Sequence, residues 1–452
     1  MVALAATSLR LFERDAWTAD RVRLPWAIAA AAKASLVAGN EHRRPGVSEK
    51  DVAAICRAYN ALNSALTPDP ATTTETLGAF LVRTSFEQFP YQQSYFEEIC
   101  RLSALFENID QLETKLLDHA LIEHILGCTI EDWTVGGFIL ATSTQANTGF
   151  FDPEWPAVQE AIDPYFSAEK LRAIFETHFL TDIRRLRCEA AAAQQADDRL
   201  RHHEFNPLTS RPFVTLPDGR FIAPQPHFVF QKLAPSALYY AGLASLGAAD
   251  AGRFSEDFGL IFEDYVGRQL ALIPNASVLP EIGYDDGKLS VDWFVIFDEL
   301  VVLVEAKATR LTALARIGAD QLAQDVKRCL GKAFDQIAAT NDLLSARHPA
   351  FSQIPADRPR IGVAVTLEPY WAANSPFLAE FLPEPPIPTT VASARAFEHL
   401  VNALRTIGGP NPLLTVLEDP DRRTWNLENA LPDAPTERNP LLDAAWKRLP
   451  FP

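Results

Sequence analysis

Three ionisable residues interrupt or end runs of the sequence that are otherwise apolar. Asp292 is the one charge in the apolar run before Asp298, and Glu305 and Lys307 close the apolar run that begins at Leu300. Charges at the centre of a sheet are costly unless they are paired or bind a metal ion. Converging carboxylates repel each other, and a divalent cation relieves that repulsion. A neighbouring lysine can hold a water molecule or stabilise charge on a transferring phosphoryl group.

Two strands joined by a tight turn at Asp298-Glu299 are predicted to position these groups. The run from Leu300 has no polar face, which is typical of a strand covered on both sides. Side chains alternate along a strand, so Val301, Leu303, Glu305 and Lys307 are expected on one face. The carboxylate and the ammonium would therefore leave the sheet together.

An Asp, about a dozen further residues and then Glu-x-Lys at the end of a hydrophobic strand resemble the signature of the PD-(D/E)xK nuclease superfamily. Asp292, Glu305, Ala306 and Lys307 carry the resemblance, and Val291 stands where proline is often found. Residues 253–367 predict a helix, three strands, a helix and a strand, an order that matches the superfamily core. The resemblance implies an α/β restriction-endonuclease-like core, in which a mixed central sheet is flanked by helices.

The resemblance also implies a set of metal ligands. Asp292 and Glu305, helped by Glu263 and by the carbonyl oxygen of Ala306, would hold Mg²⁺, with Mn²⁺ as a substitute. Lys307 would orient the attacking water or neutralise the transition state. Glu263 lies on a predicted amphipathic helix over 253–272. The alternatives to Glu263 on this helix are Glu256, Asp257 and Asp264.

The segment after Lys307 predicts helix over about 311–344, with interruptions at Gly318 and Gly331. Arg328, Lys332 and Gln336 recur at intervals of four residues, which places them along one polar side of a helix. The resemblance implies a glutamine or lysine near the metal and the scissile phosphate, and we choose Gln336 as a catalytic residue, with Lys332 second. Arg328, Lys332 and Arg310 are predicted to contact nucleic acid. A merely solvated stripe is the alternative.

Composition changes along the chain predict four parts. Residues 1–203 are expected to form a mainly α-helical N-terminal domain, with one long helix from Ser167 towards Arg201. Residues 204–250 would be a proline-rich connector with a β-hairpin at Pro217-Asp218-Gly219. Residues 251–410 would form the nuclease-like domain, and 411–452 an irregular or packed tail. The most basic stretch contains Arg184, Arg185, Arg187, Arg199, Arg201, His202 and His203. It could contact phosphates, but a solvated helix face is favoured because acidic residues dilute it.

Overall composition limits the function classes. The formal net charge of −17 argues against a general nucleic-acid coat and against a membrane-surface protein, but not against a nuclease with a basic groove. The five cysteines are scattered and form no Cys-x-x-Cys pattern, which favours reduced thiols in a cytoplasmic protein. No apolar segment reaches membrane-spanning length, and no signal peptide is expected.

The expected function is therefore metal-dependent hydrolysis of phosphodiester bonds, with DNA as the first choice of substrate. A bacterial restriction or anti-phage defence setting follows from analogy alone. The helical N-terminal domain could bind a partner protein, and a symmetric homodimer would suit double-strand cutting. The competing class is a catalytically inactive nuclease-fold protein that serves as a binding or scaffold subunit. A third reading, a hairpin in which Lys307 merely neutralises Glu305, leaves Asp292 unexplained.

Overall fold

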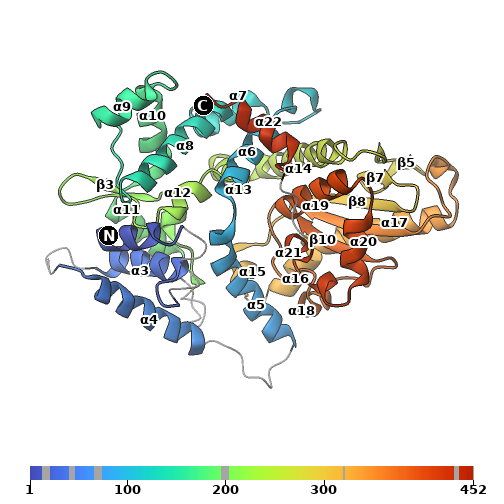
Figure 1. Cartoon of the computed structure of the whole chain (residues 1–452), viewed down its shortest axis with the longest axis horizontal. Coiled ribbons are helices and arrows are strands. Elements are labelled where there is room, and N and C mark those ends of the chain that lie inside the picture. The colour runs from blue at the N-terminus through green and yellow to red at the C-terminus, as the bar shows by residue number, and fades with distance from the viewer. Residues whose placement is uncertain are drawn as a thin grey trace.

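The fold is built around a five-stranded mixed sheet in the C-terminal half of the chain (Figure 1). The computed structural model describes residues 1–12, 21–39, 46–65, 74–194, 203–318, 321–431 and 437–450. The strand order is β10-β9-β8-β7-β4. Three strands, β4 (Ser277–Pro280), β7 (Trp293–Ile296) and β8 (Val301–Lys307), form an antiparallel meander. Two more, β9 (Arg360–Thr366) and β10 (Thr389–Ser393), continue the sheet parallel to β8.

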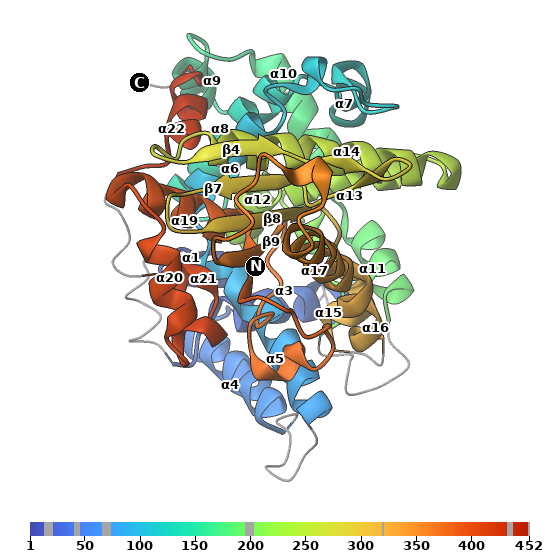
Figure 2. The same ribbon diagram turned by 90° about the vertical axis from the view of Figure 1, so that its right-hand side faces the viewer.

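Helices cover both faces of this sheet, as the alternation along β8 requires. Val302 and Val304 face a core that contains residues of α14 (Ala248–Leu270) and α19 (Ala394–Ile407). Val301 and Leu303 face a second core with α17 (Lys332–Ser345), which lies against β8 and β9 (Figure 2). The arrangement is a mixed α/β fold, and the two strands predicted around the turn at 298–299 are confirmed.

Helix α14 forms on the predicted apolar stripe, and a glycine sets its distance from the sheet. Phe258, Phe262, Val266 and Leu270 are all buried. At Gly267 a Cβ atom would lie 2.1 Å from the indole of Trp293, so only glycine lets the first residue of β7 pack this closely. The indole N–H also donates to the carbonyl of Glu263, 3.1 Å away.

Between β8 and β9 the chain is helical but not continuous. It forms α15 (Ala313–Arg316), α16 (Leu322–Val326), a π-helical segment (Lys327–Gly331) and then α17. Gly318 interrupts the helix as predicted, at φ +70°. Gly331 ends the π-helical segment that separates α16 from α17, so the α-helical pattern is interrupted there while the chain stays helical.

The N-terminal half is mainly helical. Its longer helices are α1 (Val2–Leu9), α3 (Pro25–Ala38), α4 (Glu49–Ala65), α5 (Thr74–Gln88), α6 (Tyr95–Leu105), α7 (His119–Leu126), α8 (Ile130–Ala146), α9 (Pro156–Ile162), α10 (Ala168–Ile174) and α11 (Ile183–Ala192). The predicted long helix is wrong. Ser167 caps α10, but a π-helical segment and the short strand β1 (Leu180–Thr181) follow, and Asp182 caps a new helix, α11.

The proline-rich segment belongs to the N-terminal half. The predicted hairpin is present as β2 (Phe213–Thr215) and β3 (Phe221–Ile222), with Gly219 at φ +86° in its turn. Strand β2 also pairs with β1, which makes a small three-stranded sheet. Two helices, α12 (His227–Gln231) and α13 (Pro235–Ser245), then lead to α14.

The last part of the chain is helical over most of its described residues. It contains α20 (Asn411–Glu418), α21 (Leu427–Ala430) and α22 (Pro440–Lys447), and α22 packs against α6. One hydrophobic core extends from Ile99 to Leu449 and takes in α6, α8, α14, the sheet, α19 and α22. The expected boundaries at 203 and 251 therefore do not divide two separate cores.

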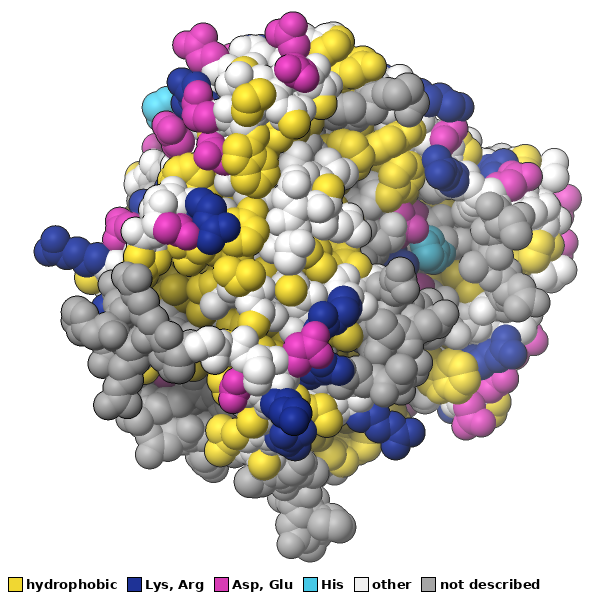
Figure 3. All heavy atoms as spheres, turned by 60° about the vertical axis from the view of Figure 1, so that its left-hand side comes forward, with side chains coloured by type: hydrophobic (Ala, Val, Ile, Leu, Met, Phe, Trp, Pro, Cys, Tyr) yellow, Lys and Arg dark blue, Asp and Glu magenta, His cyan; other side chains and the backbone are white. Residues whose placement is uncertain are grey.

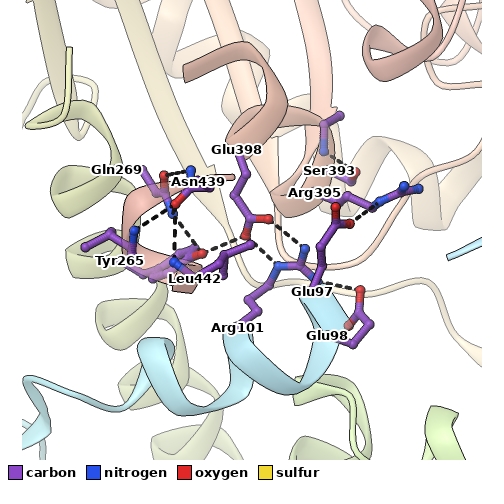
Figure 4. A network of polar contacts seen from close by, with 12 residues as sticks. Glu97, Glu98, Arg101, Tyr265, Gln269, Ser393, Arg395, Glu398, Asn439 and Leu442 are labelled. Atoms are coloured by element: carbon purple, nitrogen blue, oxygen red, sulfur yellow. Dashed lines mark hydrogen bonds and ion pairs between the residues drawn. The ribbon is translucent and has the colours of Figure 1, made fainter. Parts of the chain in front are cut away.

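A buried polar network joins four of these helices (Figure 4). Arg101 of α6 contacts both carboxylate oxygens of Glu398 of α19, at 2.6 and 2.7 Å. The hydroxyl of Tyr265 on α14 donates to the same carboxylate at 2.6 Å, and Gln269 donates to that hydroxyl at 2.9 Å. Gln269 in turn accepts from Asn439, which caps α22. Removing one partner of a buried charge pair is strongly destabilising, so this network fixes α14 against the N-terminal half.

Among the described helices, none combines the length and the apolar character that crossing a membrane requires.

Candidate active site

The strand register ends one residue short of Asp292 and brings it next to the end of β8 at Glu305. Trp293 pairs with Val304 in the antiparallel ladder, so Asp292 and Glu305 are the next residues along the two strands. Opposed residues of an antiparallel pair have side chains on the same face of the sheet. The Oδ2 atom of Asp292 accepts a hydrogen bond from the Ala306 N–H at 2.7 Å, which holds the carboxylate against the end of β8.

Lys307 and Gln336 complete this face. The Lys307 ammonium contacts Oε1 of Glu305 and donates to Oε1 of Gln336 at 2.9 Å. Gln336 comes from α17, the helix that covers this face of the sheet. Glu305 is fully buried, and its second oxygen, Oε2, has no hydrogen-bond partner. A buried carboxylate oxygen without a hydrogen bond is energetically unfavourable, so Glu305 depends on its contact with Lys307 for compensation of its charge.

Two further carboxylates approach from the side of α14 and β4. Glu263 is half-buried on α14. The negative charge of Asp292 raises the pKa of Glu263. Glu281 is exposed, directly after β4, and raises the pKa of both Glu263 and Asp292. Sequence reasoning missed Glu281. A carboxylate at the end of the strand that pairs with β7 was the available signal.

Three of these carboxyl groups have raised pKa values. Burial, followed by the charges of Asp292 and Glu281, raises the pKa of Glu263 to about 7. Burial also raises the pKa of Asp292 to about 6, against the lowering effect of the Ala306 N–H and of Lys307. Burial and the charge of Asp292 raise the pKa of Glu305 to about 8, although Lys307 opposes them. Such a group of perturbed acids is typical of functional sites.

The donor set fits a hard divalent cation. Asp292, Glu305 and Glu263 offer carboxylate oxygens, the ligand type that Mg²⁺ and Mn²⁺ prefer. In the part of the chain that the structure describes, no three His, Cys, Asp or Glu side chains are close enough together to hold a metal ion as they stand. Lys307 instead occupies one oxygen of Glu305. The Asp292, Glu263 and Glu305 side chains would have to move for their oxygens to reach a common ion.

The three residues predicted to contact nucleic acid have different surroundings. The prediction for Arg310 is wrong, because its side chain is buried, forms an ion pair with Glu368 at 3.2 Å and stacks 3.6 Å above the ring of Tyr239. Arg328 is exposed, but it is bound to Asp325 and to the carbonyl of Arg310. The π-helical turn that contains Arg328 also breaks the expected four-residue stripe. Lys332 is exposed, one turn before Gln336.

The alternatives to Glu263 are engaged elsewhere. Asp257 is buried and accepts hydrogen bonds from three successive backbone N–H groups, at residues 115–117. Glu256 pairs with Lys115, and Asp264 pairs with Arg268. Glu263 is the acidic residue on α14 whose pKa is raised by the charge of Asp292.

The N-terminal half shows a mixed surface. In Figure 3, the Lys and Arg side chains drawn in colour are interspersed with Asp, Glu and apolar side chains, so the described part of this face carries no continuous basic area. Of the basic stretch, Arg185 pairs with Glu189 at 2.8 Å, and Arg187 donates to the carbonyls of Leu36 and Gly39. Arg199, Arg201 and His202 lie outside the described residues.

Comparisons of this chain with protein-family profiles, with curated proteins and with solved structures gave no match.

Proposed function

We propose that this protein is a metal-dependent nuclease of the PD-(D/E)xK type that hydrolyses phosphodiester bonds, with DNA as its substrate. The order α14, β4, β7, β8, α17, β9 supports a restriction-endonuclease-like core. The proximity of Asp292 and Glu305, with the ammonium of Lys307 beside them, is the observation that carries the proposal. A setting in bacterial restriction or anti-phage defence is part of the proposal by analogy only.

Each residue has a chemical role in this proposal. Asp292, Glu305, Glu263 and the carbonyl of Ala306 would hold one or two Mg²⁺ ions. A bound divalent ion supplies a water of lowered pKa and stabilises negative charge on the phosphate oxygens. Lys307 would leave Glu305 and hold the attacking water or the developing charge. Gln336 would keep the ammonium oriented through the hydrogen bond that it already accepts.

Raised pKa values support the metal assignment independently of the sequence motif. Carboxyl groups that are buried together disfavour their charged forms. A divalent cation reverses this preference, because metal ligation requires deprotonated oxygens. Asp292 and Glu305 are therefore destabilising as free carboxylates and favourable as ligands, which is the arrangement expected of a binding site and not of a structural ion pair.

The test is degradation of plasmid DNA by the purified protein in Mg²⁺ or Mn²⁺, compared with EDTA. The proposal expects metal-dependent cleavage that is lost in Glu305→Ala and Lys307→Ala. Circular dichroism must show that both variants fold. Glu299→Gln, in the exposed turn before β8, is the matched control and should cleave like the wild type.

Two outcomes would contradict the proposal. Cleavage that persists unchanged in both variants would identify a contaminating nuclease. A folded wild-type protein that binds neither metal ion and cuts neither DNA nor RNA would favour the inactive nuclease-fold scaffold.

A further inference from the structure

A large cavity separates the N-terminal helices from the ends of the parallel strands. Its volume is about 1380 Å³, and it is walled by α3, α4 and α5, by α12 and α13, and by the segments that follow β8, β9 and β10. None of Glu263, Asp292, Glu305 and Lys307 lines it. Pockets for single small molecules occupy about 300–1,000 Å³, so this cavity has room for a ligand larger than most metabolites.

One wall of the cavity carries two cations, Lys232 and Arg211, that form no ion pair with a described carboxylate, although the charge of Glu189 acts on Arg211. Lys232, Arg211 and His178 all line it, and the charges of Lys232 and Arg211 act on each other and on His178. Within the described residues, no carboxylate lies at ion-pair distance from Lys232 or Arg211. Arg185 lies beside Arg211, but it is paired with Glu189. His178 adds no charge at neutral pH, since burial lowers its pKa to about 4.

Other cations around the same cavity are neutralised by acids. Lys33 pairs with Glu204, Arg316 with Glu368, and Arg395 with Glu97. The chain as a whole is strongly acidic, with a net charge of −17. Cations held in a recess without a counter-ion are expensive, and an anionic ligand relieves that expense. Beside Lys232, the Nε2 atom of Gln231 is also buried without a partner and lines the cavity with it.

Two partly exposed aromatic residues line the cavity as well. Phe205 is 46% exposed, and Tyr240 is 43% exposed with Arg316 over its ring, 5.4 Å from the centroid. Stacking on exposed aromatic rings is the sequence-tolerant way in which proteins hold nucleobases. Phosphate and a flat ring are both features of a nucleotide.

We propose that this cavity is a second ligand site that binds a nucleotide or short oligonucleotide, with its phosphate groups on Lys232 and Arg211. It is separate from the acidic cluster, which consists of Glu263, Asp292 and Glu305. Arginine offers a planar fork that fits phosphate in a bidentate manner, and lysine adds a point charge. The ligand would stand next to the segment that follows Lys307, because Leu311, Thr312 and Arg316 also line the cavity.

Calorimetric titration with ATP, pyrophosphate and citrate, all in EDTA at low salt, tests the proposal. ATP and pyrophosphate are expected to bind and citrate to bind more weakly by at least about tenfold. Lys232→Gln and Arg211→Gln should each weaken ATP binding by about tenfold or more, the loss of one charge-assisted hydrogen bond. Asp292→Asn should leave ATP binding unchanged, which keeps this result independent of the nuclease proposal. Lys170→Gln, which changes an exposed lysine paired with Asp132, is the matched control.

A second measurement needs no variant. Burial and the charge of Arg211 lower the pKa of Lys232 to about 8, so its amine should react readily with acetic anhydride. ATP should reduce labelling of Lys232 by at least about tenfold, measured by peptide mass spectrometry, and leave Lys170 unaffected. Equal labelling with and without ATP, absence of binding by any phosphate probe, or binding that is lost only in Asp292→Asn would overturn the proposal. Citrate binding as tightly as pyrophosphate would reduce the site to a nonspecific anion site and overturn its nucleotide assignment.

Discussion

Glu305→Gln should abolish cleavage and at the same time stabilise the metal-free protein. Glu305 is fully buried, and its pKa is raised from the ordinary 4.5 to about 8. Because the folded-state pKa is above the unfolded value, the unfolded chain releases the proton first as pH rises. Between about pH 4.5 and pH 8 the carboxyl group therefore makes the folded state progressively less stable. Glutamine is nearly the same shape, cannot ionise and removes this penalty.

The size of the effect follows from the two pKa values. Each pKa unit corresponds to about 1.36 kcal/mol, so the penalty at pH 7 amounts to about 3 kcal/mol and approaches about 5 kcal/mol above pH 8. These are upper figures, since Lys307 and the surrounding side chains can relax around a charged Glu305. Below about pH 4.5 the variant and the wild type should be equally stable.

Urea unfolding in EDTA at pH 4, 5.5, 7 and 8 measures this difference, and plasmid cleavage in Mg²⁺ measures activity. Glu299→Gln makes the same chemical change at an exposed position and should alter neither quantity. A Glu305→Gln protein that is less stable than the wild type at pH 7 would refute the inference that the charged form of Glu305 destabilises the metal-free protein. Full cleavage by that variant would refute its catalytic role.

Four further predictions concern the same region. Lys307→Met should lower cleavage by at least about a hundredfold without unfolding the protein, as judged by circular dichroism, because Lys307 is the described cation that acts on Glu263, Asp292 and Glu305. Mg²⁺ should raise the melting temperature more at pH 8 than at pH 6. At pH 6, Glu263 and Glu305, with pKa values of about 7 and 8, hold protons that the metal must displace. An equal rise in melting temperature at pH 6 and pH 8 would contradict this ligand set. Gly267→Ala should destabilise the protein by about 1–3 kcal/mol in urea and reduce cleavage, because the new methyl group meets Trp293. Arg310→Gln should lower the free energy of unfolding in urea by about 1–3 kcal/mol, because it removes a buried ion pair with Glu368, which still keeps Arg316 as a partner. It should leave DNA affinity per folded molecule unchanged in a filter-binding assay, since this arginine is buried.

Local patterns in the sequence were sufficient to predict β7 and β8, the two strands that carry Asp292, Glu305 and Lys307. The apolar run ending at Glu305 and Lys307 specifies a covered strand, and the turn at 298–299 specifies its antiparallel partner. Antiparallel pairing then brings Asp292 next to Glu305 at the end of β8. The burial of the α14 stripe follows from its period in the same way.

Features that depend on contacts between distant segments could not be predicted. Arg310 looks like an exposed cation in sequence, but Tyr239, from a helix that precedes it by some seventy residues, covers it. Glu281 is placed by a bend after β4, where the chain leaves the main sheet for the β5–β6 hairpin (Gly283–Tyr284 and Lys288–Leu289). Strand β10 is short and follows several prolines, so its pairing with β9 shows only in the fold.

The carboxylates of Glu263 and Asp292 repel each other, so they stay close together only if the helix and the strand that carry them are held rigidly in place. Glu263 is carried by α14, and α14 is fixed at two points. Both points lie within one turn of Glu263. The first is Trp293, which packs against Gly267 and donates its indole N–H to the carbonyl of Glu263, and so binds the helix to the strand next to Asp292. The second is Tyr265, two residues beyond Glu263, whose hydroxyl enters the buried network of Arg101 and Glu398. Because Arg101 belongs to α6, the N-terminal half supplies part of the rigidity that keeps the acidic cluster assembled, and this shared core gives a physical reason why the two halves of the chain do not form independent units.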